Sequence, residues 1–153
     1  MEIKIVDGTK HFEEVRQLIM EYTKFLNRDL TFQGIDDELK DLNKKYSPPE
    51  GRLLCAEIDN KVVGCVAYHK HNFERCEMKR LFVREEYRKF HVGQKLVEAI
   101  LDYAKSDGYS EMVLDTVEPL KSAINLYKKF GFVEIESYYN NPMSDVIYMK
   151  KIL

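Results

Sequence analysis

The chain lacks the features that would assign it to several common protein classes. It has only three cysteines, an odd number without metal-ligand spacing, inside apolar segments, at Cys55, Cys65 and Cys76. This count excludes a disulfide framework and predicts buried, reduced thiols. No apolar run approaches the roughly 20 residues that cross a bilayer, and no signal peptide is recognisable. We therefore expect a cytoplasmic protein without membrane contact.

The sequence also lacks an excess of charge of one sign. Its 24 Lys and Arg residues face 26 Asp and Glu residues, which gives a net charge of −2. That balance argues against non-specific binding to nucleic acid, so any basic cluster must be local. There is no repeat, low-complexity tract or linker. At 153 residues, 44% of them apolar, we expect a single domain over residues 1–153 with a full hydrophobic core.

A metal site is not indicated. His69 and His71 stand two residues apart and could point the same way from a strand, but no third or fourth ligand has convincing spacing. We predict no metal cofactor, and we interpret these histidines as solvated side chains.

The hydrophobic periodicity predicts both strands and helices. Strands are expected at Glu2–Val6, Leu53–Ile58, Val62–His69, Cys76–Val83, Glu111–Thr116, Phe132–Tyr138 and Val146–Ile152. Helices are expected at Phe12–Leu26, Asp36–Lys44 (with Asp36 as N-cap), Val92–Lys105 and Pro119–Phe130, the last two closed by Gly108 and Gly131.

This order of elements predicts an α/β (α+β) fold. Hairpin-connected strands in the first half and strand–helix–strand units in the second imply a mixed, mostly antiparallel twisted sheet of about seven strands, with four helices on its faces. Residues 27–35 have no clean period and are expected to form a loop.

The most informative segment is the basic turn Arg88-Lys89-Phe90-His91-Val92-Gly93-Gln94-Lys95, between an expected strand and the central helix. A strand that turns into a helix presents free backbone N–H groups at the positive end of the helix dipole, which is a site for an anion. Gly93 would let a bulky ligand approach the backbone, and Arg88 and Lys89 add charge. The segment predicts a pyrophosphate cradle; an ordinary polar turn is the alternative.

Two further residues are candidates for proton transfer. Tyr127 lies on the last helix and could give a proton to a departing thiolate, although its helical spacing from Ala123 and Phe130 also fits a core aromatic. Glu77 would share a strand face with Lys79, and, in a regular strand, with Leu81 and Val83. It could accept a proton from an incoming ammonium; a cross-strand ion pair is the alternative.

Two signatures stand in the right order and at the right distance for a known family. A strand, Met78–Val83, precedes Arg88–Gly93, which is similar to Arg/Gln-x-x-Gly-x-Gly/Ala. A second motif, Ala-x-x-Leu-Tyr-x-x-x-Gly-Phe, is matched by Ala123, Leu126, Tyr127, Gly131 and Phe132. Over nearly its whole length the chain resembles the GNAT superfamily of N-acetyltransferases. Residues 36–42, 46–51 and 138–142 resemble a bacterial-type subgroup whose acceptors are mostly unassigned.

The resemblance implies acetyl-CoA as co-substrate and direct transfer of its acetyl group to a primary amine. The strand before the turn, at Leu81, Phe82 and Val83, would lie along the pantetheine arm, and the amides of 88–95 would hold the pyrophosphate. Tyr127 matches the tyrosine that protonates the CoA thiolate, and Glu77 matches a position that some members use to deprotonate the amine.

Two departures from the family pattern stand out. His91 replaces the first glycine of the motif, and histidine adopts unusual backbone angles less readily than glycine. Leu120 stands where many members have an asparagine that contacts pantetheine.

The acceptor is expected to be a small-molecule amine, because no acidic groove for a basic peptide is recognisable. Five side chains could line its pocket or simply pack, namely Tyr22, Phe32, Arg52, Tyr138 and Tyr139. The alternatives are a non-catalytic acyl-CoA sensor and a protein lysine or N-terminal acetyltransferase. Members of the family often dimerise through their last strands, so a homodimer is an option.

Overall fold

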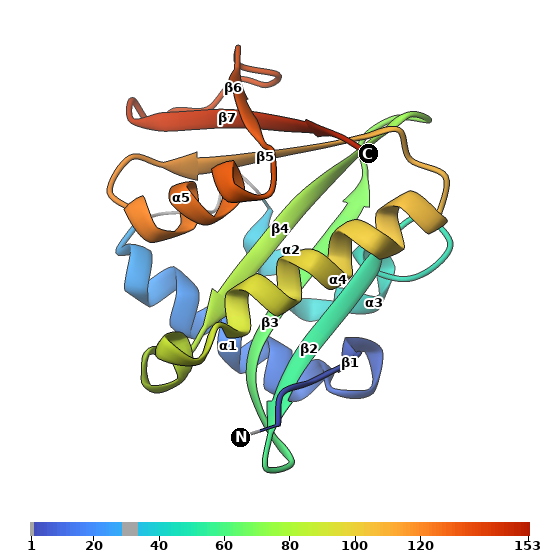
Figure 1. Cartoon of the computed structure of the whole chain (residues 1–153), viewed down its shortest axis with the longest axis vertical. Coiled ribbons are helices and arrows are strands. Elements are labelled where there is room, and N and C mark those ends of the chain that lie inside the picture. Colours follow the sequence, from blue (N-terminus) through green and yellow to red (C-terminus); the bar gives the residue numbers. More distant parts are fainter. Residues whose placement is uncertain (1, 29–33) are drawn as a thin grey trace.

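The computed structural model describes residues 2–28 and 34–153, and within them seven strands form one sheet in the order β1-β2-β3-β4-β5-β7-β6 (Figure 1). All neighbouring strands are antiparallel except β4 and β5, which are parallel. The predicted mixed, mostly antiparallel sheet is therefore confirmed. The strands are β1 (Lys4–Asp7), β2 (Arg52–Ile58), β3 (Lys61–Lys70), β4 (Arg75–Val83), β5 (Glu111–Val117), β6 (Val133–Ile135) and β7 (Val146–Ile152).

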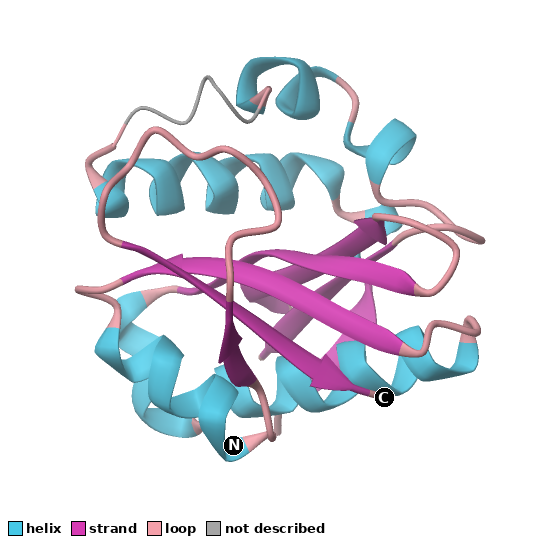
Figure 2. Ribbon diagram, turned by 90° about the horizontal axis from the view of Figure 1, so that it is seen from above, coloured by secondary structure: helices cyan, strands magenta, loops and turns pink. Residues whose placement is uncertain are grey.

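Helices cover both faces of the sheet (Figure 2). One core packs beneath α4 and α5, and a separate core lies between the other face and α1 to α3. The α-helices in the described residues are α1 (Phe12–Leu26), α2 (Ile35–Lys40), α3 (Leu42–Lys45), α4 (Val92–Ser106) and α5 (Lys121–Lys129), and the 3₁₀ helices there are η1 (Gly8–Lys10) and η3 (Glu85–Phe90).

The apolar stripes of the sequence explain these two cores. In α1, the residues Val15, Leu18 and Ile19 are fully buried, at the spacing of one helical face. The longer stripe of α4 is buried at Val92, Leu96, Val97, Ile100, Leu101 and Ala104. Each helix has one apolar face, and packing against the sheet buries that face.

The short helix after the first loop differs from the prediction. It is two helices, because Asp41 leaves the helical conformation and its carboxylate accepts a hydrogen bond from the Lys44 N–H at 3.2 Å. Asp36 is not the N-cap, since that position is taken by Gly34, which has a φ of +72°. The expected loop over residues 27–35 lies partly outside the described residues.

Two boundaries near the C-terminus also differ. The last helix begins at Lys121, so Pro119 precedes it and Leu120 occupies its N-cap position. The expected strand Phe132–Tyr138 is only Val133–Ile135 in the structure, because the chain separates from β7 after Ile135. Gly131, with a φ of +94°, does end the helix as predicted, since left-handed backbone favours glycine.

An irregularity in β4 changes which side chains share a face. Cys65 pairs with Phe82 and Ala67 pairs with Lys79, so the single β3 residue between these pairs, Val66, lies opposite two residues of β4, Arg80 and Leu81. Arg80 supplies the extra residue, with a φ of +62°, and forms a β-bulge. The prediction of one face for Glu77, Lys79, Leu81 and Val83 is therefore wrong: the first two lie toward α1, and the last two lie toward α4.

Candidate active site

The parallel strands β4 and β5 separate shortly after they begin to pair. Among the described residues, β4 pairs with β5 at Arg75, Cys76 and Glu77, and the two strands diverge beyond Glu77. Two hollows lie along this opening, and they share the lining residues Tyr22, Leu81, Leu120 and Ala123. The splayed strands thus create a passage from one face of the sheet toward the other.

The larger hollow is a groove of about 440 Å³ between the start of α4 and the start of α5. Among the predicted donor-binding residues, seven line it: Leu81, Phe82, Val83, Arg88, His91, Gly93 and Gln94. Lys89, Phe90 and Lys95 belong to the same turn but do not line the groove, and Val92 is fully buried in the core.

Arg88 is held at the groove by three contacts. Its Nε donates a hydrogen bond to the Val83 carbonyl oxygen at 2.8 Å, and its guanidinium carbon lies 4.7 Å and 5.4 Å from the ring centroids of Phe25 and Phe82. Stacking on aromatic rings preorganises a guanidinium for recognition of an anion. The fixed position of Arg88 therefore suits contact with a phosphate group.

The start of α4 combines free amides with an open approach. His91 adopts left-handed backbone with a φ of +62°, so it takes the conformation that the missing glycine would otherwise supply. A Cβ on Gly93 would contact only Leu126 Cδ2 at 3.5 Å and Val83 Cγ2 at 3.9 Å, which the fold tolerates. Glycine is thus not required here by packing, but it keeps the groove open beside the helix N-terminus.

These features fit a CoA thioester. The part of β4 that has separated from β5, at Leu81, Phe82 and Val83, offers hydrogen bonds to an amide-containing arm, and the apolar walls suit its methylene groups. Arg88 and the first amides of α4 offer donors to a pyrophosphate.

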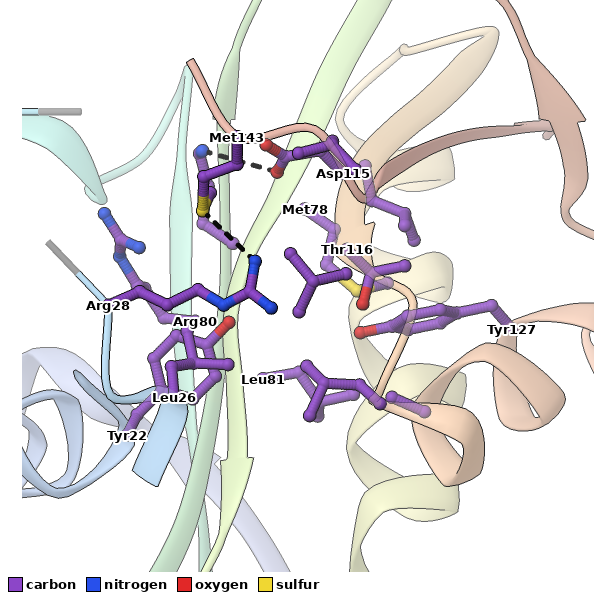
Figure 3. Close-up of a pocket in the computed structure, with 16 residues that line it drawn as sticks. Tyr22, Leu26, Arg28, Met78, Arg80, Leu81, Asp115, Thr116, Tyr127 and Met143 are labelled. Carbon is purple, nitrogen blue, oxygen red and sulfur yellow. Dashed lines mark hydrogen bonds and ion pairs between the residues drawn. The ribbon is translucent and has the colours of Figure 1, made fainter. Parts of the chain in front are cut away.

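The smaller hollow, of about 60 Å³, lies between β4 and β5 (Figure 3). Tyr127 points into it from α5, and its side chain is almost entirely buried. No residue in the described part of the chain forms a hydrogen bond with the Tyr127 hydroxyl. Burial raises the pKa of this phenol, so it stays protonated at neutral pH.

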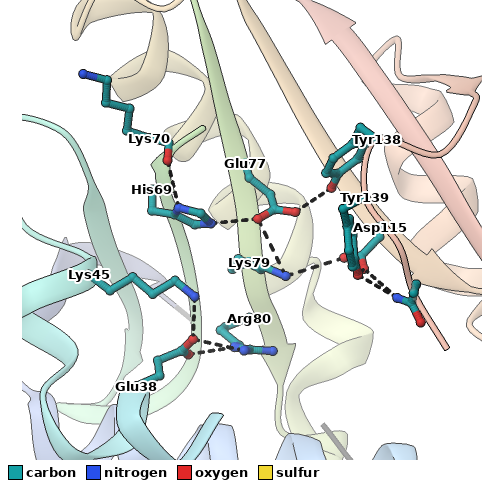
Figure 4. Close-up of polar contacts among 11 residues, drawn as sticks. Glu38, Lys45, His69, Lys70, Glu77, Lys79, Arg80, Asp115, Tyr138 and Tyr139 are labelled. Atoms are coloured by element: carbon teal, nitrogen blue, oxygen red, sulfur yellow. Dashed lines mark hydrogen bonds and ion pairs between the residues drawn. The ribbon is translucent and has the colours of Figure 1, made fainter. Parts of the chain in front are cut away.

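Glu77 does not line either hollow, although it is buried beside them (Figure 4). Its carboxylate contacts His69 Nε2 at 2.7 Å, accepts a hydrogen bond from the Tyr138 hydroxyl at 2.6 Å and lies 3.7 Å from Lys79 Nζ. Although burial itself raises the pKa of Glu77, the opposing contacts with His69, Lys79 and Tyr138 hold it at about 2. The carboxylate is therefore ionised at neutral pH.

The residues proposed for the acceptor pocket are only partly brought together. Tyr22 lines both hollows. Arg52 lines neither of them, and its guanidinium donates two hydrogen bonds to the Asp107 carboxylate. Tyr138 and Tyr139 line neither hollow. The Tyr138 hydroxyl donates a hydrogen bond to Glu77, and the Tyr139 hydroxyl donates one to Asp115. Phe32 lies outside the described residues.

Several pocket residues were missed from the sequence. Lys79, Arg80 and Asp115 line the small hollow, as do Arg28 and Met143 from the two segments that border it. The contact of Glu77 with His69 could have been found, because these residues are register partners in the β3–β4 hairpin. The others come together only through pairing of distant elements.

The remaining negative predictions can be compared with the described residues. All three cysteines are free and buried, and burial raises the pKa of the Cys65 and Cys76 thiols to about 12. No group of three or more potential metal ligands occurs in residues 2–28 and 34–153. None of the helices that the structure describes is long and apolar enough to cross a membrane.

Comparison with known proteins identifies the family. The profile of the Acetyltransferase (GNAT) family matches residues 12–132. An uncharacterized N-acetyltransferase of Schizosaccharomyces pombe is 43% identical over 150 residues, which cover 97% of this chain and 92% of that protein.

Solved structures share the fold. A GNAT-family acetyltransferase of Staphylococcus aureus Mu50 superposes with a TM-score of 0.82 at 21% identity over 99% of both chains. A GNAT-family acetyltransferase of Elizabethkingia anophelis with acetyl-CoA bound gives a TM-score of 0.63 at 24% identity, over 79% of this chain and 82% of that one. The family profile and the relative from Schizosaccharomyces pombe show that this chain belongs to the GNAT family and is an acetyl-CoA-dependent N-acetyltransferase.

Proposed function

We propose that the acceptor of this N-acetyltransferase is the primary amine of a small molecule, which attacks the acetyl group directly. The observation that carries this proposal is the meeting of a long groove and a small, walled hollow at the opening between β4 and β5. The hollow is bordered by Met143 and by Arg28, which is bound to Asp145 through hydrogen bonds of 2.6 Å and 2.7 Å. Such a border suits a compact acceptor better than a polypeptide.

On the donor side, the chain's own groups would bind and orient acetyl-CoA, which supplies the activated acetyl thioester. Arg88 and the first backbone amides of α4 hold the pyrophosphate, and the backbone of Leu81, Phe82 and Val83 holds the pantetheine arm. Gly93 allows close approach to the start of α4. These roles are supported by the groove lining and by the fixed Arg88 guanidinium.

The proton transfers would occur on opposite faces of the sheet. As the new carbon–nitrogen bond forms and the carbon–sulfur bond breaks, Tyr127 gives its phenolic proton to the leaving sulfur. Glu77 lies on the acceptor face and stays ionised, so it stabilises positive charge near the incoming amine. With a pKa of about 2 it is a weak base, and the amine's proton would reach it only through intervening groups.

An acceptor screen tests this function. Purified protein is incubated with acetyl-CoA and a broad amine library, and free thiol release is recorded, with acetylated products identified by mass spectrometry. We expect turnover with one or more small primary amines and none without an acceptor. Transfer to lysines or N-termini of polypeptides, with no transfer to small amines, would contradict the proposal.

A further inference from the structure

Three cationic side chains line the small hollow: Arg28, Lys79 and Arg80. The two arginines are engaged through paired hydrogen bonds with carboxylates: Arg28 with Asp145, and Arg80 with Glu38 at 2.7 Å and 3.0 Å. Lys79 is different, and its surroundings suggest what the hollow binds.

The Lys79 side chain is buried, and its ammonium has no close hydrogen-bond acceptor in the described part of the protein. It lies 3.7 Å from Glu77 Oε1 and 3.8 Å from Asp115 Oδ1, and only 8% of the side chain is exposed (Figure 4). Both distances exceed the roughly 2.7–3.2 Å of a good N–H···O bond. A buried ammonium has a strong need for such bonds, so an acceptor group placed beside Lys79 would be stabilised.

Asp115 presents the complementary group. Its Oδ2 accepts hydrogen bonds from the Tyr139 hydroxyl and from Asn141 Nδ2, the latter at 3.5 Å. Its Oδ1 faces Lys79 and has no hydrogen-bond donor among the residues that the structure describes. The hollow thus contains an ammonium and a carboxylate oxygen side by side, each with bonding capacity left over.

Both groups lie on the acceptor side of the sheet. Lys79 pairs with Ala67, which belongs to the core beneath α1. Asp115 follows Leu114, which belongs to the opposite core with Tyr127, and successive strand residues point to opposite faces. The Lys79–Asp115 pair therefore lies on the face of the sheet opposite α5, the side from which an amine would approach, while Tyr127 points into the same hollow from α5.

We propose that Lys79 and Asp115 select acceptors that carry a carboxylate next to the reactive amine, as α-amino acids do. The acceptor carboxylate accepts hydrogen bonds from Lys79 Nζ, and its ammonium donates to Asp115 Oδ1 before it loses a proton and reacts. Apolar residues such as Leu26, Val117 and Val146 line the rest of the hollow and suit an aliphatic side chain. This inference rests on the proposed function, because it names the class of small amine.

Matched acceptors test the inference. L-Alanine, L-leucine and L-phenylalanine are each compared with the corresponding amino acid amide, which keeps the amine and removes the negative charge. The amide's amine has the lower pKa, because the neighbouring carboxylate is gone, so a larger share of it is neutral and reactive. Intrinsic reactivity therefore favours the amide, and a preference for the free acid must come from the protein.

We expect kcat/KM for the preferred free acid to exceed that for its amide by roughly 10- to 100-fold, the range of a charge-assisted hydrogen bond. In Lys79→Met this ratio should fall to about one or below, and Lys79→Arg should restore part of it. Because both acceptors meet the same protein, a general folding defect cancels in the ratio. Lys70→Met is the matched control: Lys70 lies on β3, outside both hollows, and contacts Glu50 at 3.5 Å.

Asp115→Asn separates the second half of the pair. It should lower kcat/KM for acid and amide alike, because both carry the ammonium. Amides that react as well as acids, or an unchanged ratio in Lys79→Met, would overturn the inference.

A binding experiment keeps the inference apart from the proposed function. N-acetyl-L-leucine and N-acetyl-L-leucinamide are titrated into the wild-type protein and Lys79→Met, with CoA present. If no amine is acetylated but the acid alone binds, and only to the wild type, the function fails and the selection by Lys79 stands. If neither compound binds in preference to the other, the selection by Lys79 is wrong.

Discussion

Replacing Tyr127 by phenylalanine should slow acetyl transfer while leaving the fold intact. The side chain is almost fully buried against Phe132, with ring centroids 5.8 Å apart, and phenylalanine keeps that contact. The hydroxyl has no hydrogen-bond partner in the described residues, so its loss removes no native bond. The free energy of unfolding should therefore change little.

The size of the kinetic effect follows from the role of the hydroxyl. Loss of a positioned general acid typically lowers the rate by about 100-fold or more, which corresponds to about 2.7 kcal/mol at 25 °C. Because the proton moves only as the sulfur leaves, kcat should fall while the acetyl-CoA dissociation constant stays nearly constant. Thiol release measured at saturating acetyl-CoA gives kcat, and isothermal titration gives the dissociation constant.

Tyr109→Phe is the matched control. The Tyr109 hydroxyl donates a hydrogen bond to the Glu50 carbonyl oxygen at 2.8 Å, outside both hollows. This variant should lose about 1 kcal/mol of unfolding free energy and keep its kcat. Unchanged kcat in Tyr127→Phe, or an equal loss of kcat in both variants, would refute a role for Tyr127 as proton donor.

Three further changes have defined outcomes. Arg88→Met should weaken acetyl-CoA binding by roughly tenfold and lower the salt dependence of that binding, because a charged phosphate contact is lost. If isothermal titrations at two salt concentrations give the variant the same dissociation constants as the wild type, Arg88 does not contact the phosphate. Glu77→Gln should lower kcat/KM without changing its pH profile between about pH 5 and 9, since the pKa of Glu77 is about 2; an unchanged rate removes Glu77 from the reaction. Contacts with Arg80 and Lys45 overcome the effect of burial and hold the pKa of Glu38 at about 2, below its unfolded value of 4.5. Its stabilising contribution is therefore present above pH 4.5 and is lost as pH falls toward 2, so urea unfolding of Glu38→Gln should depend less on pH in that window than the wild type; equal slopes would contradict this.

The sequence was sufficient for the parts of the fold that depend on local pattern. The stripe of Val15, Leu18 and Ile19 predicted α1, and the apolar positions of 92–104 predicted α4, because each helix buries one continuous face. The turn that we propose to bind the pyrophosphate was also recognisable, since its features are consecutive in the chain. In contrast, the break between α2 and α3 at Asp41 depends on one side-chain cap. The free energy of that cap differs little from that of continuing the helix, so the pattern of apolar residues does not reveal the break.

The acceptor side could not be predicted in the same way. The bulge at Arg80 depends on the register between β3 and β4, and it moves Leu81 and Val83 to the face opposite Glu77. Lys79 and Asp115 belong to strands that pair only at their beginnings, so no local spacing relates them. Side chains that meet through tertiary pairing leave no periodic signal in one sequence.

The most direct measurement is the affinity of acetyl-CoA for Gly93→Glu compared with the wild-type protein, by isothermal titration. The neighbours of a Cβ at Gly93 are no closer than 3.5 Å, so the fold should accept a side chain that then enters the groove with a negative charge. We expect an unchanged melting temperature and at least a roughly 100-fold weaker dissociation constant, as repulsion of a phosphate at this helix start would produce. Equal affinity of the two folded proteins would contradict the placement of the donor's pyrophosphate at this turn.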